Sequence, residues 1–230
     1  MQPETPMMVQ GQATSVALAQ NRVLRNTYLL LALSMLPTIL GAWLGVQFNF
    51  TLFAGHPAIG FVLFLAIAFG FFFGIEKTKN TGMGVALLLA FTFFMGLMLS
   101  RMLGVVLGLA NGWSLVALAF GGTAVIFTAM ATLATTIKRD LSGVAKFLWV
   151  GALVVLVAMF ANIFLQIPAL MVALSMLVVV IFSAFMLIDV NRIVNGGETN
   201  YVTATLQLYL DIYNVFVNLL ALLGIGGGND

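Results

Sequence analysis

Polar side chains recur at helical spacing in an otherwise apolar stretch, residues 203–224, near the end of the chain. Gln207, Asp211, Asn214 and Asn218 are separated by four, three and four positions. At about 100° per residue, they fall within an arc of roughly 60° on one face of a helix. One carboxylate and three amides aligned in this way can bind protons or cations, or can simply join neighbouring helices by hydrogen bonds.

A second carboxylate precedes this stretch. Asp189 lies near the end of the apolar segment 169–193, and the short turn NGGETN leads from there into the segment that carries Asp211. Two helices joined in this way run antiparallel, so the two carboxyl groups can face each other at similar depth. Neighbouring carboxyl groups do not both ionise readily and instead share a proton. The pair is therefore predicted to form a pH-sensitive latch, which is closed when protonated and repels when ionised.

The same two side chains offer the oxygen ligands that a hard cation prefers. Calcium takes about six to eight oxygen ligands, so Asp189 and Asp211 alone predict only a weak transit site for calcium. A competing interpretation is that each aspartate pairs separately with a base, such as Arg192 or Arg101. Both arginines are also candidate gate residues, although the position of Arg101 near the end of a predicted span equally fits a side chain that extends to the membrane interface.

These polar residues belong to a chain that water alone cannot solvate. Of its 230 residues, 62% are hydrophobic and 7% are charged, and the mean hydropathy is +1.14. A soluble domain carries roughly 25% charged residues, so the lipid bilayer must be the main solvent. The chain has no cysteine, which excludes disulfides and thiol chemistry. Its net charge of +2, with lysines and arginines scattered along the chain, argues against a nucleic-acid partner.

Seven segments have the roughly 20 apolar residues that a helix needs to cross a bilayer. They are residues 27–48, 58–75, 82–104, 113–136, 147–166, 169–193 and 203–224, and short turn sequences separate them. The sequence therefore predicts an all-α integral membrane protein, in which residues 27–224 form one seven-helix transmembrane bundle. A flexible polar tail is expected at residues 1–26 and a short C-terminal tail at residues 225–230.

The depth of Asp211 in this bundle determines where the seventh helix lies. Asp211 is placed roughly 13 Å into its segment by a rise of 1.5 Å per residue. A charge that faces lipid at this depth costs ~3 kcal/mol or more. The seventh helix is therefore expected to be central, with Gln207, Asn214 and Asn218 lining the interior beside Asp211.

Lysine and arginine residues alternate between the predicted loops. They occur before the first span and in the loops after the second, fourth and sixth spans, whereas the other loops contain none. Such residues favour the cytoplasmic side of a membrane. We therefore expect the N-terminus in the cytoplasm and the C-terminus on the opposite, periplasmic side.

Several stretches of the sequence resemble a known family. FMLIDVNRIVNGGETNYVTATLQLYLDIYNVFVNLLALLG resembles the C-terminal signature of the Bax-inhibitor family, the transmembrane Bax-inhibitor-motif proteins. VLRNTYLLLALS, GGTAVIF and ANIFLQIPAL resemble the proteobacterial, YccA-like inner-membrane branch of that family. The similarity covers about residues 20–225.

The resemblance implies a seven-helix bundle with the seventh helix at its centre. It also implies that Asp189 and Asp211 match the pH-sensing aspartate pair that gates a calcium leak in the family. Proteins of this branch are further associated with the membrane AAA protease FtsH, as substrates and modulators. Two positions depart from the family pattern: Arg101 stands where proline is common, and the predicted second helix has no basic latch residue before Lys77.

We therefore predict a pH-sensitive cation (calcium) leak channel of the bacterial inner membrane, gated by the carboxylate pair, without a cofactor and without enzymatic activity. The alternative is a modulator and substrate of an FtsH-type protease, which acts by protein binding without ion flux and offers residues 1–26 as a handle. An intramembrane aspartyl protease also needs two aspartates, but bulky Leu208 and Leu210 stand where such proteases have glycine.

The loop charges generate a test of topology. A reporter that is active only outside the cytoplasm should be active when fused after Asp230 and silent when fused after Lys79 or Asp140. Reporter activity is measured in intact cells, and immunoblots confirm that each fusion is expressed. A silent but well-expressed fusion after Asp230 would contradict seven spans with a cytoplasmic N-terminus.

Overall fold

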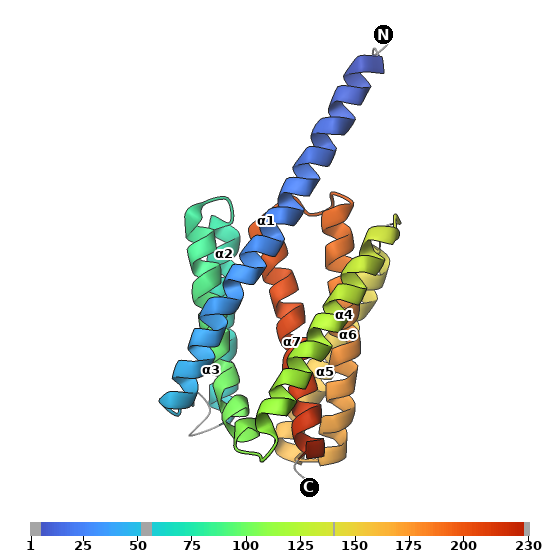
Figure 1. Ribbon diagram of the computed structural model, residues 1–230. Coiled ribbons are helices and arrows are strands. Elements are labelled where there is room, and N and C mark those ends of the chain that lie inside the picture. The colour runs from blue at the N-terminus through green and yellow to red at the C-terminus, as the bar shows by residue number, and fades with distance from the viewer. Residues whose placement is uncertain (1–5, 52–56, 140, 228–230) are drawn as a thin grey trace.

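The computed structural model describes residues 6–51, 57–139 and 141–227, and this part of the chain consists of seven α-helices (Figure 1). They are α1 (Pro6–Gln47), α2 (Pro57–Thr78), α3 (Gly82–Leu107), α4 (Gly112–Thr136), α5 (Ser142–Leu165), α6 (Pro168–Val194) and α7 (Tyr201–Gly227). Each contains a segment that is long and apolar enough to cross a membrane. The predicted all-helical architecture with seven candidate spans is therefore confirmed.

The start of α1 differs from the expectation of a flexible tail at residues 1–26. The helix continues from Gln47 back to Pro6, and its candidate membrane span begins at Gln20. Residues 7–26 contain no proline and are rich in methionine, alanine, leucine and glutamine, which propagate a helix readily once it is nucleated. The part of the expected tail that the structure describes, residues 6–26, is therefore helical, and in Figure 1 it extends beyond the other helices.

Tight turns between the helices depend on a few specific residues. Proline occupies the first position of α2 and of α6, where a missing backbone N–H costs nothing. Gln166 ends α5 in the left-handed conformation, with φ of 51°. Asn162 then holds the turn into α6, because its side chain both accepts from the backbone N–H of Ile167 and donates to its carbonyl oxygen. This short turn lets α5 and α6 pack against each other as an antiparallel pair.

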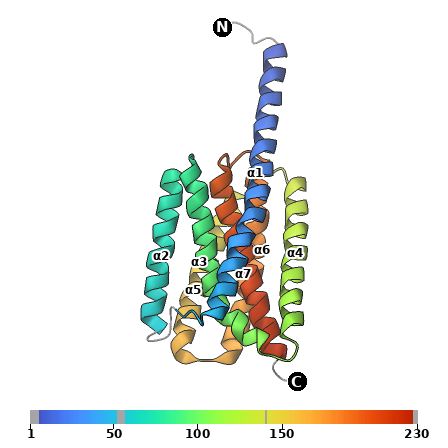
Figure 2. The same cartoon turned by 60° about the vertical axis from the view of Figure 1, so that its left-hand side comes forward.

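α7 lies in the middle of the bundle. It contacts α1, α2, α3, α4 and α6, and Figures 1 and 2 show the other helices arranged around it. Leu208, Tyr209 and Val215 of α7 are at most 1% exposed. The predicted central position of the seventh helix is therefore confirmed.

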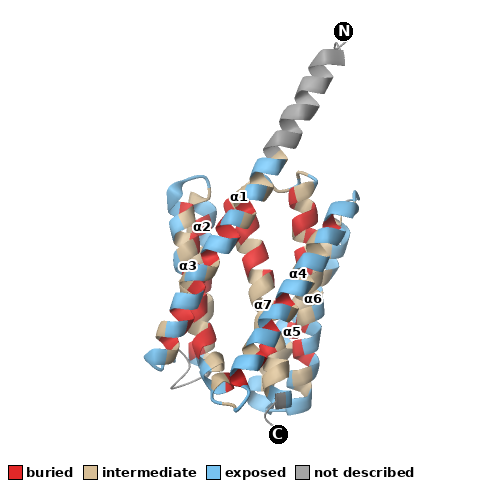
Figure 3. Cartoon of the chain, viewed as in Figure 1, coloured by how far each residue is buried: buried red, intermediate tan, exposed pale blue. Residues whose placement is uncertain are grey.

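The outer surface of the bundle is apolar rather than charged. Figure 3 shows buried residues on the helix faces that point inward and exposed residues on the faces that point outward. Phe73, Trp113 and Phe147 are 73%, 78% and 78% exposed. Such a surface would aggregate in water, but it is the expected surface for a protein solvated by lipid.

Two glycines allow the backbones of α1 and α3 to touch. A Cβ atom at Gly41 would collide with the carbonyl oxygen of Phe93, and one at Gly96 would collide with the carbonyl oxygen of Thr38. Small residues favour this close approach between helices in a membrane, where dispersion contacts replace the hydrophobic effect as the source of cohesion. α1 and α3 therefore form a tightly crossed pair, although α2 separates them in the sequence.

This crossing predicts different effects at two glycines of α3. Gly96→Ala should lower stability by about 1–3 kcal/mol, because the added methyl group must displace the α1 backbone. Gly104→Ala is the matched control, since no atom lies within 4 Å of a Cβ there. Alanine at that position should raise helix stability by up to about 1 kcal/mol. Thermal unfolding in detergent measures both variants, and equal midpoints would contradict the close contact at Gly96.

Candidate functional site

Asp189 of α6 and Asp211 of α7 meet where the two helices pack against each other. Their carboxyl groups lie close enough to interact, and Oδ2 of Asp211 is buried without a hydrogen-bond partner among the described residues. Asp211 is 5% exposed and the side chain of Asp189 is 13% exposed, so the contact lies inside the bundle. A carboxylate can only accept a hydrogen bond, so a contact between two carboxyl groups requires at least one proton. The arrangement is therefore one that a shared proton would stabilise.

Arg192 is the basic residue beside this pair. Its Nη1 lies 3.9 Å from Oδ1 of Asp189, which precedes it by three residues on α6. The Arg192 side chain is 41% exposed, so it reaches from solvent toward the carboxyl group. Glu198, in the turn after α6, adds a negative charge near Asp189. The sequence left two alternatives for Asp189, a contact with Asp211 or an ion pair with an arginine. The structure places both Asp211 and Arg192 beside Asp189.

Arg101 lies away from the pair. The carbonyl oxygen of Met95 on α3 accepts a hydrogen bond from Tyr213, at 3.1 Å, which sets the level of α3 relative to α7. Arg101 lies roughly 9 Å further along α3 at 1.5 Å per residue, and its side chain is exposed. The structure therefore does not bring Arg101 to the two aspartates.

A calcium ion at the pair would have few charged ligands. In the described ranges 6–51, 57–139 and 141–227, no group of three histidine, cysteine or acidic side chains gathers in one place. Calcium prefers about six to eight oxygen ligands. The geometry of Asp189 and Asp211 thus supports proton exchange more directly than stable binding of a metal ion.

The polar stripe of α7 continues on both sides of Asp211. Toward the C-terminal end, Asn214 and Asn218 line a pocket between α5, α6 and α7. Toward the N-terminal end, Gln207 is half-buried. Thr203 extends the same face by one turn, and its buried hydroxyl has no hydrogen-bond partner among the described residues. Thr203 lies four residues before Gln207, and this helical spacing could have identified it in the sequence as part of the polar stripe.

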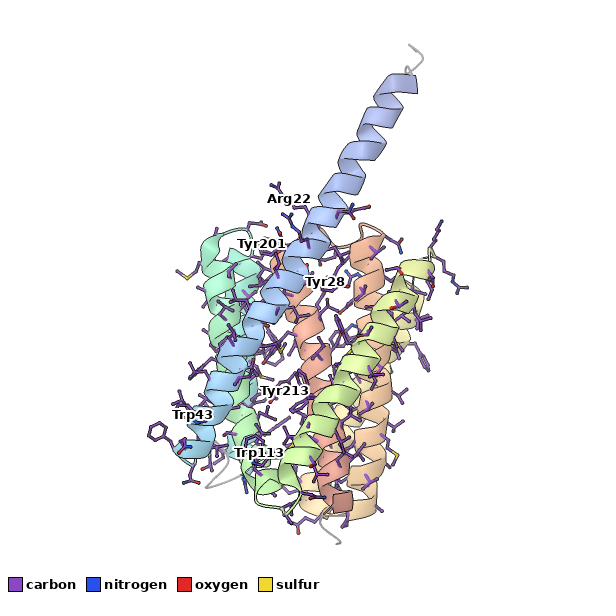
Figure 4. The ribbon with its side chains drawn as sticks, in the orientation of Figure 1. Arg22, Tyr28, Trp43, Trp113, Tyr201 and Tyr213 are labelled. Carbon is purple, nitrogen blue, oxygen red and sulfur yellow. The ribbon has the colours of Figure 1, made fainter. Side chains whose placement is uncertain are left out.

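Two tyrosines on the opposite face of α7 bond to α1 and α3, and no pattern in the sequence singles them out. The hydroxyl oxygen of Tyr209 lies 2.9 Å from Oγ1 of Thr38 on α1 and 3.4 Å from the carbonyl oxygen of Thr92 on α3. Tyr213 bonds to α3 as well, and Figure 4 shows it at mid-height of the bundle. These bonds fix α7 against α1 and α3, so that its carboxylate faces α6.

Asparagine side chains fasten the turn between α6 and α7. Asn191 is 2% exposed and donates to two carbonyl oxygens at the end of α4, those of Ala134 and Ile137, at 3.3 and 2.6 Å. Asn200 donates to the carbonyl oxygen of Lys79 at 3.2 Å and to Oδ1 of Asn80 at 2.8 Å. The turn that joins the two aspartate-bearing helices is thus attached to α4 on one side and to the α2–α3 turn on the other.

Comparison with known proteins identifies a family and several proteins that are similar to this chain. The family described as "Inhibitor of apoptosis-promoting Bax1" matches residues 20–228. The "Modulator of FtsH protease YccA" of Escherichia coli K12 is 38% identical over 207 residues, which cover 90% of this chain and 91% of that protein. An uncharacterized protein of Pseudomonas aeruginosa is 37% identical over 228 residues, covering 97% of this chain and all of its own length. An uncharacterized protein of Neisseria meningitidis serogroup A is 36% identical over 219 residues, which cover 94% of this chain and 96% of that protein.

Fold and site together define a multi-pass membrane protein with a buried carboxyl pair between its central helix, α7, and α6. The chain belongs to the Bax inhibitor family, and the resemblance seen in the sequence is thereby confirmed. The family match covers the candidate spans of all seven helices.

Proposed function

We propose that this protein modulates an FtsH-type membrane AAA protease of the bacterial inner membrane by binding to it. The supporting observation is the 38% identity, over 90% of the chain, to the modulator of FtsH protease YccA. The YccA protein of a second Escherichia coli strain, similar over the same 90% of this chain, carries the name inner membrane protein. Because the alignments span nearly the whole of both chains, they support a shared role of the entire bundle rather than of one segment.

The N-terminal part of α1 offers such a protease a segment outside the bundle. α1 continues as a helix beyond its candidate span, which begins at Gln20 (Figure 1). Gln20 itself lies against Gly196 in the turn between α6 and α7. The residues before Gln20 can therefore be removed without the loss of a membrane-crossing segment, while the base of α1 keeps its contact with the bundle.

This proposal predicts slower turnover of a truncated chain. Deletion of residues 2–15 should lengthen the half-life by about twofold or more in cells with active FtsH, because exposed terminal segments are where proteolysis starts. The half-life is followed by pulse–chase, and thermal unfolding confirms that the truncated bundle is folded. In a strain whose protease is inactivated, the two chains should decay at the same rate. Equal half-lives in the strain with active protease would count against the handle.

The carboxyl pair favours a second function, a pH-sensitive leak of cations such as calcium. The observation that favours it is the close approach of Asp189 and Asp211 inside the bundle, where Oδ2 of Asp211 is buried without a hydrogen-bond partner in the described part of the chain. Burying two ionisable groups costs desolvation energy that their interaction rarely recovers, so stability alone seldom explains such a pair. Ionisable residues within membrane spans are typical of ion and proton pathways. Neither proposal requires the protein to catalyse a reaction.

The proton count gives the direction of the pH dependence. In the closed form the two carboxyl groups share a proton, and at higher pH that proton is lost and the two charges repel. At an effective dielectric constant of 20, two unit charges about 4 Å apart repel by about 4 kcal/mol. Arg192 offsets part of the charge on Asp189, whereas Glu198 adds to the repulsion. Low pH therefore favours the closed bundle, and higher pH favours separation of α6 from α7.

The leak proposal predicts the behaviour of amide variants. Asp211→Asn keeps the shape and a hydrogen bond but removes one ionisation, so the closed form should persist as the pH rises. Calcium flux into liposomes loaded with a calcium dye should lose its pH dependence. At high pH the flux should fall by about tenfold or more, because each loss of about 1.4 kcal/mol of the repulsion that favours the open form lowers its population tenfold. Asp189→Asn should act similarly, and the double variant should add little because coupled groups act as one unit.

Glu76→Gln provides the matched control, because it makes the same acid-to-amide change at an exposed residue near the end of α2. Its flux and pH profile should equal those of the unaltered protein. If both aspartate variants also keep the unaltered pH profile, the pair is not a gate, and the protease proposal remains without a channel function.

A further inference from the structure

A pocket of about 200 Å³ lies between α5, α6 and α7, on the side of Asp211 toward the C-terminal end of α7. Its walls are apolar and include Leu153 and Met159 of α5 and Val178 of α6. α7 contributes two carboxamides, those of Asn214 and Asn218. Asn218 is only 7% exposed, so its polar side chain is enclosed by the walls rather than directed to a membrane surface.

Hydrogen bonding fixes which atom of each amide faces the pocket. Asn214 donates its Nδ2–H to the carbonyl oxygen of Leu210, and Asn218 donates to that of Asn214, both at 2.8 Å. A carbonyl oxygen can only accept, so the amide nitrogen must face the helix and Oδ1 must point away from it. Neither Oδ1 atom accepts a hydrogen bond from another described residue. The pocket thus receives two acceptor oxygens about one helical turn apart.

Acceptor oxygens in an apolar pocket require donors, because an unpaired carbonyl group costs roughly 1–3 kcal/mol in proteins. The acyl chains of lipid have no donor to offer. Water has two, and at about 30 Å³ per molecule several water molecules fit into the pocket. Carbonyl oxygens also attract small cations and repel anions. We propose that the pocket between α5, α6 and α7 is a hydrated vestibule that admits small cations and excludes anions.

Phe185 separates this vestibule from the carboxyl pair. It is 6% exposed and precedes Asp189 by four residues, so it lies one turn closer to the pocket on α6. Its ring centroid lies 5.3 Å from that of Trp149 and 5.7 Å from that of Phe182, two residues that line the pocket. These aromatic contacts place Phe185 between the vestibule and Asp189 along α6. Movement of α6 away from α7 would open it toward the pair.

This inference does not rest on the protease proposal, and it extends the leak proposal by giving cations and protons a path toward the pair. The two can fail separately. A dry pocket would leave the pH dependence of the aspartate variants unchanged, and a hydrated pocket would persist in a protein that conducts no ions. The test is therefore of water and charge in the pocket, and not of flux.

Single-cysteine variants can report on the pocket, because the chain has no cysteine of its own. Asn218→Cys and Ile181→Cys place a thiol in the pocket, and the second keeps both amides. Val154→Cys is the control, since Val154 is 63% exposed on α5, next to the pocket residue Leu153 and at the same depth in the bundle. Each variant is reconstituted in liposomes, and membrane-impermeant methanethiosulfonate reagents of either charge are supplied on both faces.

Thiols react as thiolates, which form only where water reaches them. Asn218→Cys and Ile181→Cys should react with the cationic reagent at least about tenfold faster than Val154→Cys. Relative to a simple thiol in solution, both pocket variants should also show a greater preference for the cationic reagent over the anionic one. If Asn218→Cys does not fold, Ile181→Cys decides the outcome.

Two results would overturn the proposal. If Ile181→Cys reacts as slowly as Val154→Cys with both reagents, the pocket is dry and occupied by lipid. If the ratio of the two rates equals the ratio for a simple thiol in solution, water enters the pocket but the amide oxygens do not select charge.

Discussion

In the hydrocarbon interior of a membrane, the polar groups on α7 cannot be left facing lipid, and this constraint explains most of the bundle. The tyrosines on one face of α7 bond to α1 and α3. The carboxylate on the other face meets the carboxyl group of α6. A helix with hydrogen bonds to satisfy in several directions cannot lie at the edge of the bundle, because lipid would then face one of its polar sides. The other helices therefore surround it.

The contacts of α7 differ in strength from one side to the other. On the side of α1 and α3, backbones touch at Gly41 and Gly96, and neutral hydroxyl groups hold the helices together in a way that does not depend on pH. On the side of α6, the contact is between two groups that can acquire charge. α5 packs chiefly on α6 and leaves the amide-lined pocket beside α7. Any response to pH should therefore appear as motion of α5 and α6 relative to a fixed core of α1, α3 and α7.

Those properties of the chain that depend on local composition could be predicted from the sequence. Runs of apolar residues predicted the seven spans. The short NGGETN turn between the sixth and seventh spans was enough to predict that Asp189 and Asp211 lie on adjacent antiparallel helices. The helical spacing of Asn214 and Asn218 likewise predicted one shared face, and the structure places both in one pocket. Residues 6–26 are helical in the structure, whereas their polar composition alone predicts a flexible tail.

What the sequence could not predict depends on partners that are far apart along the chain. Tyr209 bonds to Thr38, 171 residues away, and Asn200 bonds to Lys79, 121 residues away. Neither residue has a local pattern that identifies its partner. The collision that makes glycine necessary at position 96 likewise depends on where Thr38 of α1 lies. One sequence without aligned relatives carries no record of these pairs, so only the arrangement of the helices in space reveals them.

The central position of α7 has a consequence for biogenesis. Ribosomes deliver helices to the membrane in chain order, so the six helices that surround α7 are inserted before it. Until α7 arrives, the hydroxyl group of Thr38 and the carboxyl group of Asp189 lack the partners that α7 provides in the finished bundle. The early helices must therefore stay loosely associated, or be held by the insertion machinery, so that α7 can still enter between them. Final compaction of this protein is thus a late, post-insertional event that depends on its most polar transmembrane segment.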